Sequence, residues 1–320
     1  MKHVLITGGC GFIGSNFINH YFYNSDCCII NIDAMYYCAN ENNVTKEIRN
    51  SPRYTLVRGN IASIDLVKHI LDYFTIDTVI HFAAQSHVET SFSDALKYTH
   101  DNIVGTHTLL ECCRLYGKIT KFIHISTDEV YGESMLEEHE NKKNENSILC
   151  PTNPYAATKA AAELIVKSYY HSFKMPIIIT RGNNVYGPNQ YPEKVIPLFI
   201  KLLKDNKPIT IQGDGSNVRS FLHVKDVANA LDIILDKGVI GEIYNIGGDD
   251  SCEYTIDTLA KKIIMMIHNT DNYDKWITYI KDRPFNDKRY YISNDKLKQL
   301  GWIIEENFDD GLKELCNQTV

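Results

Sequence analysis

Residues 3–14 read HVLITGGCGFIG, an apolar run that leads directly into a turn in which Gly8, Gly11 and Gly14 recur at every third position. Glycine permits a tight turn and a close approach of the backbone to a pyrophosphate, and the N-terminus of a following helix attracts phosphate. We therefore expect a strand, a phosphate-binding turn and a helix, the first unit of a dinucleotide-binding fold. The spacing alone is a weak signal, because it departs from G-x-G-x-x-G and an ordinary glycine turn can share it.

A carboxylate farther along the chain supports the dinucleotide interpretation. Asp33 ends the second expected strand, nineteen residues after Gly14, where an acidic side chain binds the ribose hydroxyls of adenosine. A carboxylate there disfavours the 2′-phosphate of NADP, so the sequence predicts NAD as the cofactor. The residues expected to bind it in this part of the chain are Gly8, Gly11, Phe12, Ile13, Gly14 and Asp33.

Short apolar runs alternate with amphipathic stretches of helical length, which is typical of α/β proteins. The expected strands are His3–Thr7, Cys28–Ile32, Thr55–Arg58, Thr78–His81, Lys121–Ser126 and Ile177–Arg181. The expected helices are Ile13–Tyr23, Ile64–Phe74, Tyr98–Tyr116 and Tyr155–Phe173. This order predicts a Rossmann-type doubly wound parallel sheet. The pattern loosens after about Pro188, so we expect residues 1–187 to form the NAD-binding domain, 221–247 to return to it, and 188–320 to form a smaller C-terminal lobe.

Composition excludes several classes of protein. The 320 residues are 44% hydrophobic, enough for a sizeable core, and the net charge of −7 argues against binding nucleic acid or anionic membranes. No apolar run approaches the roughly 20 residues that span a bilayer, and the first apolar stretch is too short for a signal peptide. The nine cysteines have no C-x-x-C spacing, which indicates reduced thiols in a cytoplasmic protein and no metal site.

Residues 126–132 read STDEVYG, and Tyr155 and Lys159 follow downstream. A tyrosine and a lysine four residues apart share one helix face, so the ammonium can stabilise the phenolate. We expect this to lower the pKa of Tyr155 from about 10 toward neutrality, worth about 4 kcal/mol, and to make it a base for a sugar hydroxyl. Thr127 would orient the substrate oxygen. Asp128 and Glu129 add an acid and a second base, which oxidation alone does not need, so they suggest elimination of water.

Each of these features has a simpler explanation when taken alone. Lys159 could be an exposed lysine on an ordinary helix, and Asp128 with Glu129 could form a solvated turn. Their combination with the dinucleotide turn favours a catalytic site. Three cations are candidates for holding a second phosphate-bearing ligand, although each could be a surface charge of little energetic worth: Lys194, Arg219 and Arg283.

Together these motifs resemble the extended short-chain dehydrogenase/reductase superfamily and, within it, the nucleotide-sugar 4,6-dehydratases. Supporting stretches are His81–Val88, Asn102–Thr106 and Tyr244–Gly248. A finer similarity, to the dehydratase domain of plant UDP-rhamnose synthases, which act on UDP-glucose, is carried by Arg181–Lys194, Gly213–Ser220 and Arg283–Tyr290. The resemblance covers almost the whole chain and implies that the C-terminal lobe binds the nucleotide sugar.

The resemblance also implies site residues. Those expected at the cofactor, beyond the glycine turn and Asp33, are Asn60, Ile61, Ala83, Ala84, Asn102, Tyr155 and Lys159. Those expected at the substrate are Ser86, Thr127, Asn184, Lys194, Val195, Gln212, Arg219, Asn245 and Arg283. The expected catalytic residues are Thr127, Asp128, Glu129, Tyr155 and Lys159.

Two departures from the family pattern bear on the ligands. Residues 283–287 read RPFND where bacterial dTDP-glucose 4,6-dehydratases usually have R-P-G-H-D, which favours UDP over dTDP. Asn60 stands where the family usually has an aspartate at the adenine. Its amide oxygen can still accept a hydrogen bond from the adenine amino group, so we expect at most a modest loss of NAD affinity.

The sequence therefore predicts a UDP-glucose 4,6-dehydratase that forms UDP-4-keto-6-deoxyglucose with transiently reduced bound NAD, in UDP-rhamnose or deoxysugar synthesis. Three alternatives stay open: a dTDP-glucose 4,6-dehydratase, a UDP-sugar 4-epimerase, and a non-catalytic NAD or sugar-nucleotide sensor. By resemblance we expect a homodimer paired through the helices Tyr98–Tyr116 and Tyr155–Phe173. Because the chain ends at Val320, we expect a separate downstream epimerase/reductase.

Overall fold

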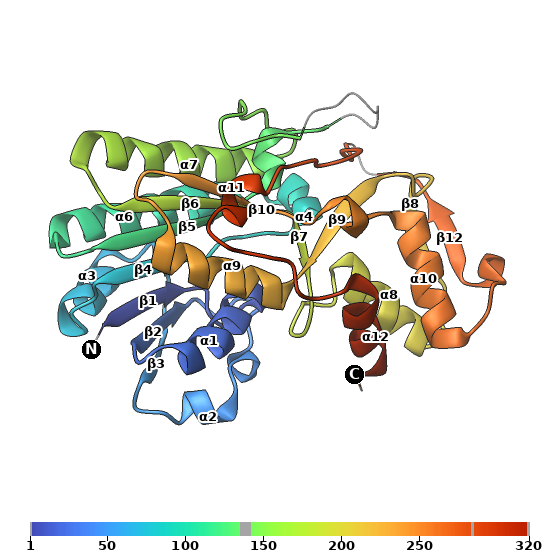
Figure 1. Ribbon diagram of the computed structural model, residues 1–320, viewed down its shortest axis with the longest axis horizontal. Coiled ribbons are helices and arrows are strands. Elements are labelled where there is room, and N and C mark those ends of the chain that lie inside the picture. Colours follow the sequence, from blue (N-terminus) through green and yellow to red (C-terminus); the bar gives the residue numbers. More distant parts are fainter. Residues whose placement is uncertain (1, 135–141, 283–284, 319–320) are drawn as a thin grey trace.

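The computed structural model describes residues 2–134, 142–282 and 285–318. A parallel sheet of seven strands forms the centre of the larger lobe, in the order β10-β6-β5-β4-β1-β2-β3 (Figure 1). Its strands are β1 (His3–Thr7), β2 (Cys28–Asp33), β3 (Tyr54–Arg58), β4 (Thr78–His81), β5 (Lys121–Thr127), β6 (Ile177–Gly182) and β10 (Ile243–Ile246). The order reverses at β1, which pairs with both β2 and β4. This arrangement confirms the predicted Rossmann-type doubly wound sheet.

Helices cover both faces of the sheet because alternate residues of each strand point to opposite sides. On one face Ile6 and Ile80 pack with Phe17 of α1 (Phe12–Asn24) and Leu231 of α9 (Val224–Lys237). On the other face, residues such as Leu5 and Val79 pack against three helices, α3 (Ile64–Tyr73), α6 (Gly105–Tyr116) and α7 (Pro154–Phe173). Apolar packing on both faces of the sheet fixes the strands relative to one another, and with them the positions of their carboxyl ends.

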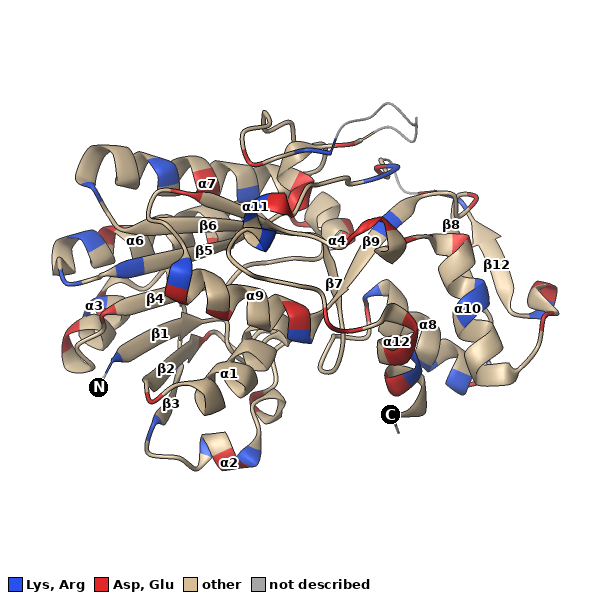
Figure 2. Cartoon of the chain, viewed as in Figure 1, with Lys and Arg blue, Asp and Glu red and all other residues tan. Residues whose placement is uncertain are grey.

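The smaller lobe has its own apolar core. It contains α8 (Val195–Lys204), α10 (Ile256–His268), α12 (Phe308–Asn317) and the parallel pair β8 (Ile209–Gln212) and β12 (Ile277–Ile280). A three-stranded sheet of β7 (Asn184–Tyr186), β9 (Val218–His223) and β11 (Glu253–Thr255) lies between the lobes (Figure 1). Positions of Lys and Arg and positions of Asp and Glu are interspersed along the backbone of both lobes (Figure 2).

Two parts of the chain beyond residue 187 belong to the larger lobe. Helix α9 packs on α1, and β10 pairs with β6. Farther on, α11 (Asp295–Lys298) contacts β10, and Leu297 and Trp302 lie in the same core as α1. The Trp302 indole donates a hydrogen bond to the Asp226 carbonyl, at 3.0 Å. The chain therefore crosses between the lobes more often than the sequence pattern suggested.

The helix expected over Tyr98–Tyr116 is interrupted. After α5 (Ala95–Tyr98), residues Thr99–Val104 form a wider π-helical turn before α6 begins. Asn102 explains the interruption, because its side chain accepts from the Gln85 amide at 2.7 Å and donates to the Gln85 carbonyl at 3.0 Å. Such turns often accompany functional sites. The helices that were not expected include two short ones, α2 (Lys46–Arg49) and α4 (Val88–Ser93).

Candidate active site

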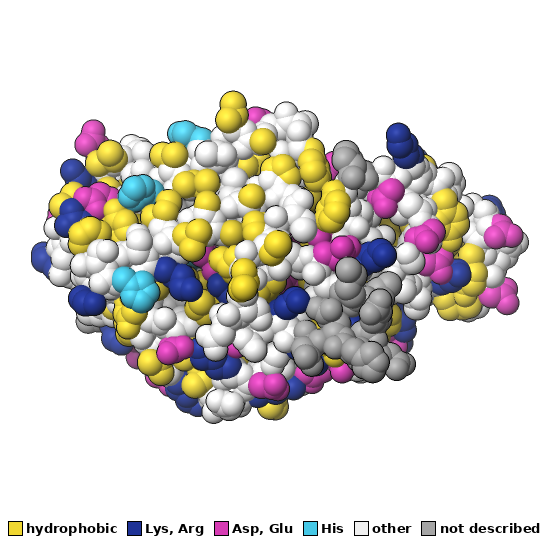
Figure 3. Space-filling model, turned by 90° about the horizontal axis from the view of Figure 1, so that it is seen from above, with side chains coloured by type: hydrophobic (Ala, Val, Ile, Leu, Met, Phe, Trp, Pro, Cys, Tyr) yellow, Lys and Arg dark blue, Asp and Glu magenta, His cyan; other side chains and the backbone are white. Residues whose placement is uncertain are grey.

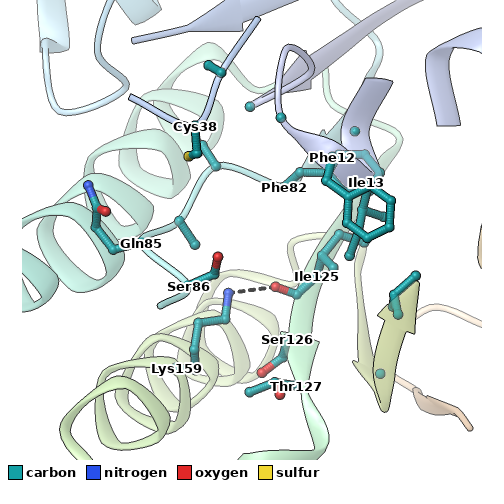
Figure 4. A pocket seen from close by; sticks show the side chains of 18 of the residues that line it. Phe12, Ile13, Cys38, Phe82, Gln85, Ser86, Ile125, Ser126, Thr127 and Lys159 are labelled. Atoms are coloured by element: carbon teal, nitrogen blue, oxygen red, sulfur yellow. Dashed lines mark hydrogen bonds between the residues drawn. The ribbon is translucent and has the colours of Figure 1, made fainter. Parts of the chain in front are cut away.

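A cavity opens at the carboxyl ends of the sheet strands, beside the point where the strand order reverses. In open α/β sheets this is where ligands bind. Figure 4 shows Ser126, Thr127 and Lys159 projecting into it from β5 and α7, with Phe12 and Ile13 at the glycine turn. The predicted residues that line the cavity are Gly8, Gly11, Phe12, Ile13, Gly14, Asp33, Asn60, Ile61, Ala83, Ala84, Ser86, Thr127, Asp128, Glu129, Tyr155, Lys159, Asn184 and Lys194.

Each glycine of the turn meets different neighbours, so glycine is suited to each position for a different steric reason. Gly8 has φ +71°, and a Cβ there would lie 2.8 Å from the Ala83 backbone. At Gly14 a Cβ would lie 2.6 Å from the Gly8 carbonyl oxygen, so this glycine lets the helix approach the strand. A Cβ at Gly11 would meet only the Gly8 oxygen, at 3.3 Å, and Gly11 faces the cavity. Gly11 therefore leaves room for a ligand, which fits a pyrophosphate at this turn.

Asp33 is fixed beside the glycine turn by backbone donors. Its carboxylate accepts hydrogen bonds from the Cys10 amide at 2.9 Å and the Met35 amide at 2.8 Å. Burial raises the pKa of Asp33, and these two donors oppose the rise. Each carboxylate oxygen keeps a lone pair, so the group can also accept ribose hydroxyls. The turn and Asp33 together fit a dinucleotide whose adenosine ribose carries no 2′-phosphate.

Asn60 lies at the adenine end of the cavity, where it has protein partners on both of its amide atoms. Its oxygen accepts from the Ala62 amide at 2.8 Å, and its nitrogen donates to the Tyr36 hydroxyl at 3.0 Å. The Tyr36 hydroxyl in turn lies 3.5 Å from an Asp101 carboxylate oxygen. The Asn60 oxygen retains a second lone pair for an adenine amino group. Tyr36, which also lines the cavity, was not singled out from the sequence.

Tyr155 and Lys159 are both buried on the face of α7 that meets the cavity. The Lys159 ammonium donates a hydrogen bond to the Ile125 carbonyl at 2.6 Å, drawn as a dashed line in Figure 4. Burial lowers the pKa of Lys159 to about 8, with Glu163 opposing.

The predicted low pKa of Tyr155 is wrong for this structure. Burial raises the pKa of the phenol, the charges of Glu129 and Asp128 raise it further, and a hydrogen bond with Thr127 only partly opposes them. A neighbouring ammonium lowers the pKa of a phenol, whereas removal of the phenol from water raises it. The second effect, which the prediction from sequence left out, is the larger one. Tyr155 is therefore a neutral phenol in the protein described here.

Asp128 and Glu129 differ in their surroundings. Burial and then the charge of Glu129 raise the pKa of Asp128 to about 7, so it can hold a proton at neutral pH. Its two oxygens accept from the Asn183 amide at 2.6 Å and the Thr127 hydroxyl at 3.1 Å. Burial also raises the pKa of Glu129, opposed by a 2.9 Å hydrogen bond from Asn153. The site thus places a proton donor and a proton acceptor side by side.

Comparison with known proteins places this geometry in a family. The family model for GDP-mannose 4,6 dehydratase matches residues 5–315. A trifunctional Arabidopsis thaliana protein, UDP-glucose 4,6-dehydratase/UDP-4-keto-6-deoxy-D-glucose 3,5-epimerase/UDP-4-keto-L-rhamnose-reductase, is 47% identical over 98% of this chain and 46% of its own. A Dictyostelium discoideum dTDP-D-glucose 4,6-dehydratase is 44% identical over 98% of this chain and 80% of its own.

A crystal structure of the dTDP-glucose 4,6-dehydratase DesIV from Streptomyces venezuelae, with NAD bound, superposes with a TM-score of 0.92. It is 35% identical, over 98% of this chain and 96% of its own. The chain belongs to the nucleotide-sugar 4,6-dehydratase family. The family predicted from the motifs is thereby confirmed. The chain spans about half the length of the plant relatives.

Several residues predicted from the family pattern do not line the cavity. The side chain of Asn245 is fully buried, where it accepts from the Tyr131 hydroxyl at 2.8 Å and donates to two backbone carbonyls. Asn102 acts on the loop after β4 through Gln85 and does not reach the cavity itself. Val195 begins α8 and Gln212 ends β8, both in the smaller lobe.

Arg219 also lies beside the cavity lining and not in it. Its guanidinium lies 5.0 Å from the centre of the Tyr290 ring and donates to the Asn286 side chain at 3.2 Å. From there its charge opposes the raised pKa of both Asp128 and Glu129. Lys194, by contrast, lines the cavity and donates to the Ser86 carbonyl at 2.8 Å. Arg283 lies outside the described residues.

The sequence interpretation missed four polar neighbours of the two carboxylates. Asn183 follows β6, and because Thr127 of β5 pairs with Gly182, the next residues Asp128 and Asn183 adjoin. Pairing the two strands would have found it. Asn153 caps α7 and also donates to Glu129. Tyr290 and Asp287 come from a distant segment, and nothing local in the sequence points from them to Glu129.

Two further observations concern other classes of site. Among the described residues, His, Cys, Asp and Glu side chains nowhere gather in a group of three or more that could hold a metal ion. In the same residues, every helix is too short or too polar to cross a membrane.

Proposed function

We propose that this protein is a UDP-glucose 4,6-dehydratase, which converts UDP-glucose to UDP-4-keto-6-deoxyglucose with NAD as a cofactor that is regenerated in each turnover. One observation carries the proposal: Asp128, with a pKa near 7, lies beside Glu129 at the cavity that also holds Tyr155 and Lys159. Oxidation of a sugar needs only the tyrosine and the lysine. The added pair supplies the acid and the base that the loss of water requires.

Oxidised NAD, when bound at the glycine turn and Asp33, accepts a hydride from sugar C4, returns it to C6 after water has left, and brings a positively charged ring. That charge and the Lys159 ammonium favour the Tyr155 phenolate, which opposes the effect of burial. Tyr155 then takes the proton of the sugar 4-hydroxyl, and Thr127 holds the same oxygen by a hydrogen bond. The product of this step is a 4-keto sugar.

The ketone makes the proton at C5 acidic, so Glu129 can remove it. The electron pair of the broken C5–H bond forms a C5–C6 double bond as the C6–O bond breaks. Asp128 gives its proton to the departing hydroxyl, and water leaves. Glu129 finally returns its proton to C5. Tyr155 then still holds the proton of the 4-hydroxyl and Asp128 lacks the proton that left with water, so the passage of one proton from Tyr155 to Asp128 through solvent restores the starting state and closes the cycle. Because Asn183 holds Asp128 and Asn153 holds Glu129, each carboxyl group stays in the place where its proton is used.

The nucleotide preference rests on a smaller observation. Phe285 and Asn286 replace the glycine and histidine usual in bacterial dTDP-glucose enzymes, and the Asn286 side chain accepts a hydrogen bond from Arg219. The plant relatives with 47% identity carry UDP-glucose in their names. Both observations support UDP.

The test is mass spectrometry of UDP-glucose and dTDP-glucose after separate incubation with the purified protein and NAD. Loss of one water from UDP-glucose, faster than from dTDP-glucose, is the expected result. Faster dehydration of dTDP-glucose would reverse the nucleotide preference and keep the reaction. No loss of mass from either would contradict the proposed reaction and favour a 4-epimerase, which rotates the keto sugar without losing water.

We also propose that the protein is a homodimer through α6 and α7. Leu115 of α6 and Leu164 and Phe173 of α7 are more than half exposed. Figure 3, seen from the side of α7, shows apolar side chains gathered across this face. When two copies of the chain pair through this face, its apolar side chains are removed from water. Buried free thiols such as Cys113 fit the reducing cytoplasm.

A further inference from the structure

Glu129 is held from two sides by side chains of different parts of the chain. On one side the Asn153 amide donates to a Glu129 carboxylate oxygen at 2.9 Å. On the other side the Tyr290 hydroxyl lies 3.4 Å from the same oxygen. Tyr290 belongs to the segment that returns from the smaller lobe, and its side chain is buried. The proton acceptor proposed above therefore touches both lobes.

The proton of Tyr290 is already engaged. Its hydroxyl makes a short hydrogen bond with a carboxylate oxygen of Asp287, closer than its contact with Glu129. Burial and the two neighbouring carboxylates raise the pKa of Tyr290, so the phenol stays protonated. A phenol has one proton to donate, so the Tyr290 oxygen presents a lone pair to Glu129. A lone pair offers little to an ionised carboxylate and accepts a hydrogen bond from a protonated one.

A second contact fixes Asp287. The Thr152 hydroxyl donates to the other Asp287 carboxylate oxygen at 2.7 Å. Thr152 precedes Asn153, whose oxygen also caps α7 by accepting from the Ala156 amide at 2.9 Å. A closed ring results, from Glu129 through Asn153 and Thr152 to Asp287, and back through Tyr290. This ring leaves the Tyr290 oxygen little freedom to turn away from Glu129.

We propose that Tyr290, oriented by Asp287, is a positioning residue that accepts a hydrogen bond from Glu129 once Glu129 has taken the C5 proton. The contact shortens when Glu129 is protonated and lengthens when it is ionised. It therefore lowers the barrier of the elimination step and leaves the first oxidation unchanged. This inference rests on the role proposed for Glu129.

Other charged groups act on Glu129 in both states and have to be held constant in a test. Asp128 and Asp287 disfavour its ionised form, whereas Lys194 and Arg219 favour it. Tyr155 faces it from α7. Substitution of Tyr290 by phenylalanine removes the hydroxyl, and with it both the contact with Glu129 and the hydrogen bond to Asp287. It keeps the ring on which Arg219 lies.

The experiment mixes Tyr290→Phe, loaded with NAD, with excess UDP-glucose and records the near-ultraviolet absorbance of reduced nicotinamide. Because oxidation is unaffected and elimination is slowed, reduced cofactor accumulates, and turnover falls about tenfold. Uptake of deuterium at C5 from heavy water, read by nuclear magnetic resonance, falls by the same factor. UDP affinity stays within error of the unchanged protein, whereas the unfolding midpoint falls, because Asp287 loses a buried hydrogen-bond donor. Tyr291→Phe is the matched control, since its neighbouring ring lies over Arg289.

Wild-type turnover and no accumulation of reduced cofactor in Tyr290→Phe would overturn the proposal. So would an equal loss of oxidation and elimination, which indicates general damage to the site. If Tyr290→Phe folds poorly, Asp287→Ala gives the second measurement, because loss of the acceptor frees the Tyr290 proton and should also slow C5 exchange. Glu129→Gln tests the role of Glu129 separately from that of Tyr290. Normal elimination in that variant would contradict the role of Glu129 itself.

Discussion

Replacing Asp128 by asparagine should make the protein more stable and nearly inactive. Burial raises the pKa of Asp128 from 3.8 to about 7. Since the unfolded chain holds this proton more weakly, the folded protein loses stability as the pH rises from about 4 to about 7. The loss is complete at pH 8 and amounts to about 4 kcal/mol. Asparagine is close in shape, carries no charge, and its oxygen can still accept from Asn183.

The assay is urea denaturation at pH 4 and pH 8, alongside turnover of the nucleotide sugar. Asp128→Asn should unfold at higher urea than the wild type at pH 8, and at similar urea at pH 4. Turnover should fall by about 10²–10⁴-fold, because the departing hydroxyl has lost its proton donor. Asp72→Asn, at an exposed position, is the control and should change neither quantity. Equal stability of Asp128→Asn and wild type at pH 8 would refute the reasoning.

Three other predictions follow from single features. Glu163→Gln leaves the buried Arg181 without its carboxylate partner, which lies 2.6 Å away, and should lower the free energy of unfolding by about 3–5 kcal/mol in urea; a loss below 1 kcal/mol would contradict this. Gly8→Ala, strained at φ +71°, should abolish NAD binding measured by calorimetry, and unchanged affinity would argue against the turn. Leu164→Glu places a charge on the proposed dimer face of α7 and should halve the mass measured by light scattering. An unchanged dimer mass would show that α7 is not the dimer face.

The parts of the fold that could be predicted from the sequence are those whose structure is specified by residues close together in the chain. The apolar run at residues 3–7 and the glycine turn both lie within a few bonds of the structure that they specify. The interrupted helix near Asn102 did not follow, because its cause is a hydrogen bond to Gln85, seventeen residues away. Helical periodicity contains no information on such a partner.

The features of the candidate site also divide into those that could be predicted from neighbouring residues and those that depend on distant ones. The motif around Asp128 and the pair Tyr155 and Lys159 identified the reacting groups, because each group lies close to the next in the chain. The pKa of Tyr155 could not be predicted, since the burial that raises it depends on how distant parts of the chain pack around the phenol. Tyr290 was equally out of reach, because it meets Glu129 across 161 residues of sequence.

The ring around Glu129 limits how these enzymes can be recombined. Its members Asp287 and Tyr290 arrive with the same segment that holds Arg219 through Asn286. A chimera that takes the smaller lobe of a relative in order to change the nucleotide would exchange the supports of the proton acceptor at the same time. Nucleotide choice and elimination rate should therefore change together in such chimeras, and engineering one without the other requires keeping Thr152, Asp287 and Tyr290 as a set.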